Sequence, residues 1–371
     1  MSSFQNTKAI DIFCGCGGMS WGLHKSGIEV LLGIDSDEKY IQSFRKNFGK
    51  EKTSCMDIRE VRGKDILSNL GIMRGELDLL VGGPPCQGFS KNTPVSRRNA
   101  DSDNNLLINE YLRIADELLP QNLIIENVAE MKRGFDGSYT DRIYNELSDR
   151  GYNIVDHVFD ASDYGLPQRR KRAFFLGSRV GRKIAIPPKT HFDESTNTDD
   201  LFGFQHKVTV WDAIGDLPNV SHDEKLGPQH YRCDPFSDYQ RSMRGSLQTV
   251  SNHTPRKMSY IQFRRLSALQ PGQGLKDLPE DLQVKGGYSG VYGRLTKSMV
   301  APTITRWVFH PGSGRWGHPE DIRTITPRET ARIQGFSDDY EFEGTYTDIC
   351  GQLGNAVPPL LMKTILQAFS D

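Results

Sequence analysis

The chain has 371 residues, of which 36% are hydrophobic and 25% are charged, and its formal net charge is −1. This length favours two lobes over a single core, and the balanced charge excludes a general attraction to nucleic acid, so any nucleic-acid surface must be local. No apolar run reaches the roughly 20 residues of a membrane helix, and the first residues lack a secretory-signal pattern, so we expect no membrane association and a cytoplasmic location.

Short apolar runs alternate with helical patterns over residues 1–180. Strands are expected at residues 9–13, 30–34, 77–81, 123–127, 154–159 and 173–176. Helices are expected at residues 19–26, 40–48, 106–119 and 140–150. Strands that alternate with helices favour an α/β fold with a doubly wound, mainly parallel sheet.

A glycine-rich turn at residues 13–18 separates the first strand from the first helix. Glycines there let the backbone approach a ligand closely beside a helix N-terminus. Asp35 ends the second strand, where a carboxylate can accept hydrogen bonds from ribose hydroxyls. Asp57 can end a third strand and reach an adenine amino group, or it can cap a helix. By themselves these residues fit a nicotinamide cofactor, a flavin, S-adenosylmethionine or no ligand.

The six cysteines are scattered along the chain, which argues against a disulfide framework. Cys14 and Cys16 form the only close pair, and no second Cys/His cluster accompanies them. We therefore expect no metal site.

Cys86 follows a buried-strand pattern, and Pro84 and Pro85 restrict the backbone directly before it. The polar stretch at residues 90–105 favours a mobile loop after it. A thiol held at the carboxyl edge of a parallel sheet, beside a mobile loop, suits covalent catalysis. The alternative interpretation is a turn that contains an incidental cysteine.

Two further polar groups lie near expected strands. Glu126 ends a strand, where burial can raise its proton affinity and make it a general acid; the alternative is an exposed or helix-capping carboxylate. Gln168, Arg170 and Arg172 alternate along an extended chain and therefore share one face. Guanidinium groups on that face can hold a carboxylate or a phosphate, or they can form a basic surface turn.

From residue 181 to about residue 326 the chain is rich in Gly, Pro, His and Asn, which is typical of a second, irregular lobe. Between Arg241 and Arg265 there is no acidic residue, so this stretch is either a DNA surface or a solvated loop face. Its basic residues are Arg241, Arg244, Arg256, Lys257, Arg264 and Arg265. Helical periodicity returns at residues 327–334 and 360–369, and Pro327 suits a first helical turn.

Six motifs follow one another along the chain. They are DIFCGCGG (11–18), GPPCQGFS (83–90), ENV (126–128), QRRKR (168–172), RETARIQGF (328–336) and QLGNAVPP (352–359). This ordered series resembles the complete motif set of the DNA cytosine-C5 methyltransferases found in bacterial restriction-modification systems. The resemblance extends from Asp11 to Pro359, nearly the whole chain.

The resemblance implies a Rossmann-like, S-adenosylmethionine-dependent methyltransferase fold with a smaller, irregular target-recognition domain. It implies a catalytic and cofactor-binding domain at residues 1–184, a target-recognition domain at 185–325, and a return of the chain to the catalytic domain at 326–371. The residues that match positions lining the S-adenosylmethionine pocket are Phe13, Gly15, Gly17, Asp35, Asp57, Asn355 and Val357.

The resemblance also assigns catalytic roles. Cys86 attacks C6 of a cytosine that has been flipped out of the duplex, and Glu126 contacts N3 and the exocyclic amine. Arg172 helps to bind the flipped base or its phosphate, while Arg170 orients Glu126.

The basic stretch falls inside the implied recognition domain, where we expect it to contact DNA through phosphates or guanine edges. The loop after the nucleophile supplies the further candidates Ser90, Arg97 and Arg98. The implied partners are double-stranded DNA and a cognate restriction endonuclease that acts on the same site. A monomer is the expected state, because one recognition lobe can read a short site.

Two residues depart from the pattern of this family. Ser36 stands where this family often has a bulky residue that packs on the adenine. Asp103 stands where an arginine is common, and Arg97 or Arg98 can supply that positive charge instead. Two alternatives stay open: an RNA cytosine-C5 methyltransferase of the same architecture, and a catalytically inactive DNA-binding relative. A nicotinamide oxidoreductase would account for the glycine-rich turn and for Asp35, but for none of the motifs after Val81.

Overall fold

The computed structural model describes residues 4, 6–85, 107–132, 137–193, 205–221, 227–284 and 290–369. The predicted nucleophile Cys86 lies outside the described residues, as do Ser90, Arg97, Arg98 and Asp103. The chain divides into two compact units. The first comprises Met1–Asp160, Lys171–Pro188 and Val357–Asp371, and the second comprises Ala161–Arg170 and Lys189–Ala356.

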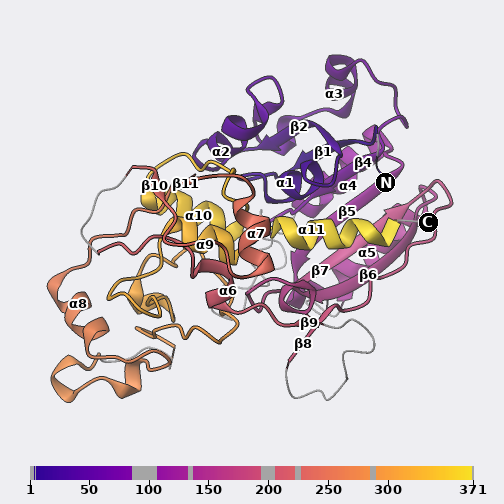
Figure 1. Cartoon of the computed structure of the whole chain (residues 1–371). Helices are drawn as coiled ribbons and strands as arrows, with labels where there is room; N and C mark the ends of the chain where they lie inside the picture. The colour runs from indigo at the N-terminus through magenta and orange to yellow at the C-terminus, as the bar shows by residue number, and fades with distance from the viewer. Residues whose placement is uncertain are drawn as a thin grey trace. The chain divides into compact units, whose positions relative to one another are not determined.

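A seven-stranded sheet forms the centre of the described part of the first unit (Figure 1). Its strands are β1 (Lys8–Ile12), β2 (Glu29–Asp35), β3 (Thr53–Cys55), β4 (Leu79–Gly82), β5 (Asn122–Val128), β6 (Asn153–Asp160) and β7 (Lys171–Ser178). They are arranged in the order β3-β2-β1-β4-β5-β7-β6. The first five run parallel, and β7 runs antiparallel to both β5 and β6. The predicted mainly parallel α/β sheet is therefore confirmed.

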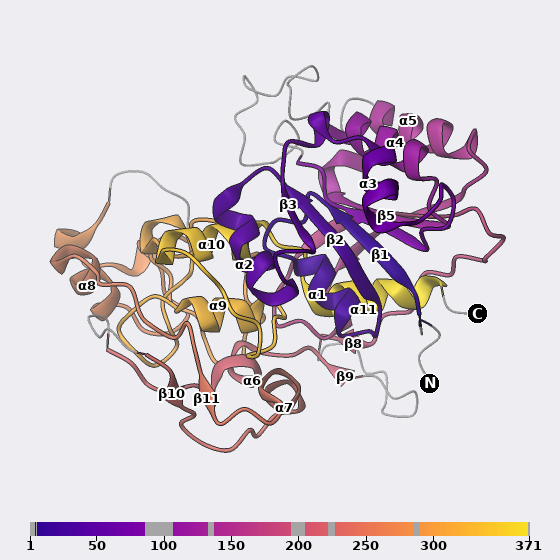
Figure 2. The ribbon, with the colours of Figure 1, turned by 90° about the horizontal axis from the view of Figure 1, so that it is seen from above.

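Helices cover both faces of this sheet, as Figure 2 shows. One face carries α3 (Gly63–Leu70), α4 (Leu107–Leu118) and α5 (Ser138–Ser148). The other carries α1 (Gly18–His24), α2 (Glu38–Phe48) and α11 (Pro359–Leu366). Because both faces are covered, the central strand β4 is buried along its whole length, as expected for a parallel strand with an almost continuous apolar sequence.

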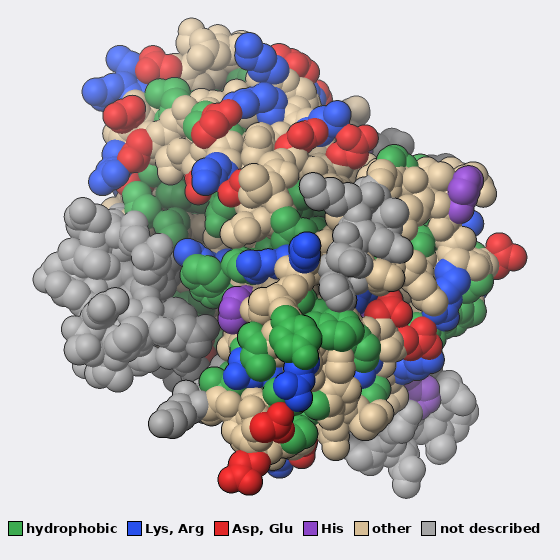
Figure 3. Space-filling model, turned by 90° about the vertical axis from the view of Figure 1, so that its left-hand side faces the viewer, with side chains coloured by type: hydrophobic (Ala, Val, Ile, Leu, Met, Phe, Trp, Pro, Cys, Tyr) green, Lys and Arg blue, Asp and Glu red, His purple; other side chains and the backbone are tan. Residues whose placement is uncertain are grey.

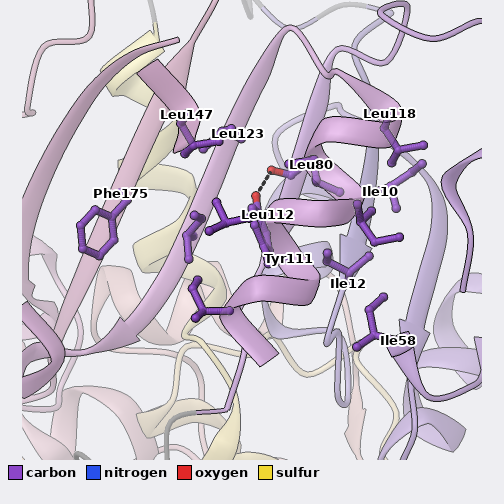
Figure 4. Close-up of a cluster of buried hydrophobic side chains, with 14 of the residues drawn as sticks. Ile10, Ile12, Ile58, Leu80, Tyr111, Leu112, Leu118, Leu123, Leu147 and Phe175 are labelled. Atoms are coloured by element: carbon purple, nitrogen blue, oxygen red, sulfur yellow. Dashed lines mark hydrogen bonds between the residues drawn. The ribbon is translucent and has the colours of Figure 1, made fainter. Parts of the chain in front are cut away.

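The hydrophobic core under α4 is drawn in Figure 4. Tyr111 lies fully buried among Ile12, Leu112 and Leu123 in this core. Its hydroxyl group donates to the carbonyl oxygen of Leu80 at 3.1 Å. A buried tyrosine hydroxyl needs such a partner, and here the bond joins α4 to β4.

The C-terminal helix α11 packs against α1, although the two helices stand at opposite ends of the chain. A Cβ atom at Gly22 of α1 would lie 2.5 Å from the carbonyl oxygen of Pro359, so the contact requires a glycine. The C-terminal helix thus belongs to the same unit as the N-terminal strand and helix.

The second unit contains short elements, in keeping with its irregular sequence. Its strand pairs are β8 (His191–Phe192) with β9 (Gln205–His206), and β10 (Gln229–His230) with β11 (Thr249–Val250). Its α-helices in the described ranges are α6 (Val210–Ile214), α7 (Asp238–Arg244), α8 (Tyr260–Ser267), α9 (Pro327–Ile333) and α10 (Tyr346–Asn355). Pro327 occupies the first turn of α9, as its position in the sequence predicts.

Buried ion pairs hold α9 inside the second unit. Arg332 is fully buried and pairs with Asp216 and, at 2.7 Å, with Asp338. Arg323 likewise pairs with Glu329 at 2.7 Å. The sequence-based division placed residues 326–356 with the catalytic domain, whereas the compact units place them in the second unit. These ion pairs are the physical reason for that difference, because a buried charge must stay beside its partner.

Candidate active site

The glycine-rich turn between β1 and α1 adopts a backbone that few residues tolerate. Gly15 and Gly17 have positive φ angles of 53° and 86°, and Phe13, which is not a glycine, also has a positive φ of 62°. Such a conformation costs a non-glycine residue roughly 1 kcal/mol or more and tends to occur at functional sites. A Cβ atom at Gly15 would meet no atom within 4 Å, so space is open beside the turn.

Asp35, at the end of β2, fixes this turn. Its carboxylate accepts hydrogen bonds from the backbone N–H groups of Gly15 at 2.8 Å and Asp37 at 2.9 Å. Burial raises the pKa of the Asp35 carboxyl, and the hydrogen bonds from Asp37 and Gly15 oppose this shift. The backbone of Ser36 also hydrogen-bonds to this carboxylate. An ionised carboxylate offers about four lone-pair sites, so the group can still accept from a hydroxyl group such as one of a ribose.

Asp57 serves as the N-cap of the short 3-10 helix η1 (Ile58–Glu60), which was one of its two predicted roles. Its side chain accepts from the Arg59 N–H at 3.0 Å and pairs with the Arg59 guanidinium group. Hydrogen bonds from Arg59 lower the pKa of the Asp57 carboxyl. A contact with an adenine amino group stays a prediction.

The last motif of the sequence meets the first motif at Val357. A Cβ atom at Gly18, the first residue of α1, would overlap the backbone carbonyl group of Val357. The first unit thus brings together two predicted cofactor motifs that are far apart in the sequence. Asn355 is the exposed last residue of α10 and belongs to the second unit.

Asp11 is a fully buried acidic residue that the sequence analysis did not select as a site residue. It lies in β1 with no solvent exposure and accepts a 2.6 Å hydrogen bond from the Ser20 hydroxyl group of α1. Burial raises the pKa of the Asp11 carboxyl to about 7. The sequence signal that could have identified it is an acidic residue within the apolar run at residues 9–13. An aspartate is rarely fully buried unless it has a partner.

Glu126, near the end of β5, pairs with Arg172 and lies close to Gly83. The Nε atom of Arg172 lies 3.0 Å from its carboxylate, and the two side chains are only 17% and 12% exposed, respectively. A Cβ atom at Gly83 would lie 3.0 Å from the other carboxylate oxygen. The neighbouring Asn127 donates to the Pro84 carbonyl at 3.0 Å. The carboxylate is therefore fixed against the turn from which the sequence continues directly to Cys86.

Arg170 lies two residues before Arg172, the arginine that pairs with the Glu126 carboxylate. That Arg170 itself orients Glu126 stays a prediction. Arg170 precedes β7 and belongs to the second unit. Its buried guanidinium group donates to the carbonyl oxygens of Ile304, Gly354 and Ala356 at 3.0–3.1 Å. It therefore acts as a structural link within the second unit.

The basic stretch between Arg241 and Arg265 is divided among α7, β11 and α8. Arg241 pairs with Asp238 and Arg264 with Asp281. The remaining cations differ in their surroundings. Arg244 and Arg265 donate to carbonyl groups of the same unit, Arg256 lies over the ring of Phe309, and Lys257 is exposed. The arginines therefore do not form one free basic face.

Within the described ranges, no group of three or more His, Cys, Asp or Glu residues is arranged to hold a metal ion. Among the helices that the structure describes, none has the length and apolar character needed to span a bilayer.

Comparison with known proteins gives consistent matches over the whole chain. A family model described as C-5 cytosine-specific DNA methylase matches residues 7–371. The chain is 32% identical to the Type II methylase M.HgiDII of Herpetosiphon aurantiacus, over 97% of this chain and 94% of that protein. It is 29% identical to the Type II methyltransferase M.AgeI of Thalassovita gelatinovora, over 97% and 98% respectively. A solved E. coli structure, described as a prophage-encoded DNA modification methyltransferase, aligns with a TM-score of 0.75 and 26% identity over 98% of both chains.

Proposed function

The chain belongs to the C-5 cytosine-specific DNA methylase family, and from this premise we propose how its own residues carry out the reaction. The activity of the chain is site-specific methylation of DNA at C5 of cytosine. Methyltransferases of this family generally use S-adenosylmethionine, and DNA is the substrate.

The proposed chemistry begins at Cys86. Its sulfur adds to C6 of a cytosine that the enzyme has turned out of the duplex, which makes C5 nucleophilic enough to accept a methyl group. Glu126 contacts N3 and the exocyclic amine and stabilises the activated ring. A base then removes the C5 proton, and the bond between sulfur and C6 breaks. The arrangement that carries this proposal is the carboxylate of Glu126, held by Arg172 against the turn that leads to Cys86.

Arg172 has two tasks in this proposal. Its guanidinium group orients the Glu126 carboxylate, with which it pairs, and it helps to bind the flipped base or its phosphate. Arg170 is proposed as a positioning residue only, since its hydrogen bonds go to backbone carbonyl groups.

The proposed cofactor is S-adenosylmethionine, which supplies the methyl group when it is bound. Two features fit this ligand: the open space beside Gly15, and the carboxylate of Asp35, which can accept a further hydrogen bond. Asp35 is proposed to accept from the ribose hydroxyls and Asp57 to receive the adenine amino group. The remaining proposed pocket residues are Phe13, Gly15, Gly17, Asn355 and Val357.

The proposed DNA contacts extend over the recognition region and the loop after the nucleophile. Among the predicted cations, Lys257 is the strongest candidate, because its side chain is exposed and no described carboxylate pairs with it. Arg256 likewise has no described carboxylate partner, but it is half-buried over Phe309. Arg241 and Arg264 must first give up an ion pair. The further proposed contacts are Arg244, Arg265, Ser90, Arg97 and Arg98.

The partners and location are proposed from the type of relative. The relatives M.HgiDII and M.AgeI are Type II enzymes, so we propose a bacterial restriction-modification role with a cognate endonuclease for the same site. We propose that the enzyme works as a monomer in the bacterial cytoplasm, where its DNA substrate lies.

One experiment tests this function. A plasmid is recovered from cells that express the chain or its Cys86→Ala variant, and 5-methylcytosine is mapped by bisulfite-type or nanopore sequencing. A single short sequence methylated only with the intact chain is the expected result. Unmethylated DNA together with methylated RNA would favour the RNA methyltransferase instead. No methylation of either polymer by folded protein supplied with S-adenosylmethionine would favour the inactive relative.

A further inference from the structure

An exposed tryptophan lies on a loop that sequence patterns did not single out. Trp307 is 50% exposed, the most of the four tryptophans. The Arg306 guanidinium group lies 4.9 Å from the centre of its ring, and the ring of Phe309 lies 5.8 Å away. Arg256 in turn lies over Phe309 at 4.7 Å. These four residues form the Trp307 cluster, in which two aromatic rings are flanked by two guanidinium groups.

The chain that leads into this cluster is fixed at Ile304. Its N–H donates to the Gln168 side-chain oxygen at 2.8 Å, and its carbonyl oxygen accepts from Arg170 at 3.0 Å. Gln168 and Arg170 are both buried and belong to one of the sequence motifs. The QRRKR motif therefore positions the segment that carries Trp307.

The cluster itself is also held from two sides. A Cβ atom at Gly354 would overlap the backbone nitrogen of Arg306, so the end of α10 lies directly against this loop. The Ser313 hydroxyl group donates to the Trp307 carbonyl oxygen at 2.6 Å. An exposed apolar ring on a fixed backbone loses little conformational entropy on binding. This is the expected arrangement of a binding residue.

The charges of the cluster favour a polyanion. Within the ranges that the structure describes, neither Arg256 nor Arg306 has a carboxylate oxygen within 4.0 Å, whereas Arg241 and Arg264 each pair with an aspartate. A guanidinium group without a carboxylate partner can bind a phosphate without first losing an ion pair. Figure 3 shows the side of the molecule that lies on the left in Figure 1, where hydrophobic side chains lie beside Lys and Arg side chains, with Asp and Glu side chains also present.

We propose that Arg306 and Trp307 contact DNA at the target site, Arg306 through a phosphate and Trp307 through the face of a nucleobase. In an intact duplex the base faces are covered by stacking, but removal of the target cytosine from the stack exposes the faces of its neighbours. An aromatic ring can then stack on such a face, regardless of the base. This proposal rests on the proposed function.

The test measures DNA affinity with the full chain and two duplexes, one with the target sequence found by methylation mapping and one without it. Trp307→Ala is expected to raise the Kd for the target duplex about tenfold, with little effect on the other duplex. Arg306→Ala is expected to weaken both duplexes and to lower the slope of log Kd against log salt by about 0.9. Trp307→Phe retains a ring and is expected to retain most of the affinity.

Matched variants separate this role from mere exposure or charge. Phe236 is also 50% exposed, and Phe236→Ala should leave both affinities unchanged. Arg62, an exposed arginine at the N-terminus of α3, is the control for Arg306. Wild-type protein that methylates DNA while Trp307→Ala binds the target normally would refute this inference alone. Wild-type protein that neither binds nor methylates DNA would refute the proposed function as well.

Discussion

The guanidinium group of Arg172 lies 3.0 Å from the carboxylate of Glu126 across the antiparallel pair of β5 and β7. Arg172 stands opposite Val128, two residues beyond Glu126, so the two side chains share one face of the sheet. The register of β7 against β5 therefore places a charged partner beside the carboxylate that is proposed to activate the cytosine.

Loss of this partner should slow methylation. Arg172→Ala is expected to reduce the single-turnover rate roughly 100-fold, a typical cost of losing one preorganised electrostatic contact. Arg172→Lys should recover only part of the rate, because an ammonium group cannot reproduce the guanidinium geometry. The control is Arg142→Ala, which removes an exposed ion pair with Glu146 on α5. An undiminished rate in Arg172→Ala would show that this pair does not support catalysis.

Replacement of the proposed nucleophile should separate binding from chemistry. Cys86→Ala is expected to abolish turnover but to leave the folding and the DNA affinity of the chain intact, because it removes only the sulfur atom that attacks C6. Methyl incorporation and a DNA-binding titration on the same preparation check both parts. Appreciable methylation by this variant would exclude the covalent mechanism.

One methyl group added at the contact between the first and last motifs should lower the stability of the protein. Gly18→Ala places a Cβ atom on the Val357 carbonyl, and such overpacking typically costs about 1–3 kcal/mol of unfolding free energy. Gly227→Ala is the control, because its added methyl group meets no atom within 4 Å and its φ is not positive. Thermal denaturation of both variants should show a lower Tm for Gly18→Ala only. Equal Tm values would mean that the two motifs can separate at little cost.

Asp11 should give the protein a recognisable pH dependence. Its pKa is raised from 3.8 to about 7, so between these values the folded state retains a proton that the unfolded state has lost. Stability therefore falls as the pH rises from about 4 to 7. Asp11→Asn cannot titrate, so its stability relative to wild type should rise over this window, by at most about 4 kcal/mol. Denaturant unfolding at several pH values measures this difference, and parallel curves for the two proteins would contradict it.

The predicted DNA-contacting cations should differ in how much each contributes to DNA affinity. Lys257→Ala is expected to lower the slope of log Kd against log salt by about 0.9, as for one lost phosphate contact. Arg264→Ala should lower it less, because this guanidinium group already pairs with Asp281 at 3.2 Å. Titrations at several salt concentrations compare the two. A larger effect of Arg264 would show that its ion pair opens when DNA binds.

The fold was predictable because alternating apolar runs and helical patterns leave few arrangements for residues 1–180. Strand direction was not, because an apolar run such as residues 173–176 looks the same whether its strand is parallel or antiparallel. The helices α7 and α8 were missed in a region without clear periodicity. Their S-x-x-Q starts, at Ser237 and Ser259, form capping boxes and could have been recognised.

The contacts of the site residues could not be predicted from the sequence either. Local motifs identified Glu126 and Arg172, but which arginine pairs with the carboxylate depends on where β7 begins. The role of Arg170 depends on Ile304, 134 residues further along the chain. The Trp307 cluster likewise depends on contacts between distant segments. No spacing rule relates such residues, so only the three-dimensional structure could reveal them.

The hydrogen bonds of Arg170 have a consequence for building hybrid enzymes. Residues 161–170 interrupt the first unit in sequence but belong to the second, where Arg170 joins three backbone carbonyl groups. A recognition segment transplanted between relatives as one continuous cassette, for example residues 189–356, would leave this ten-residue stretch behind and rely on the host's version of it. A working chimera therefore needs two grafted pieces, the long segment and the short stretch around Arg170, taken from the same donor.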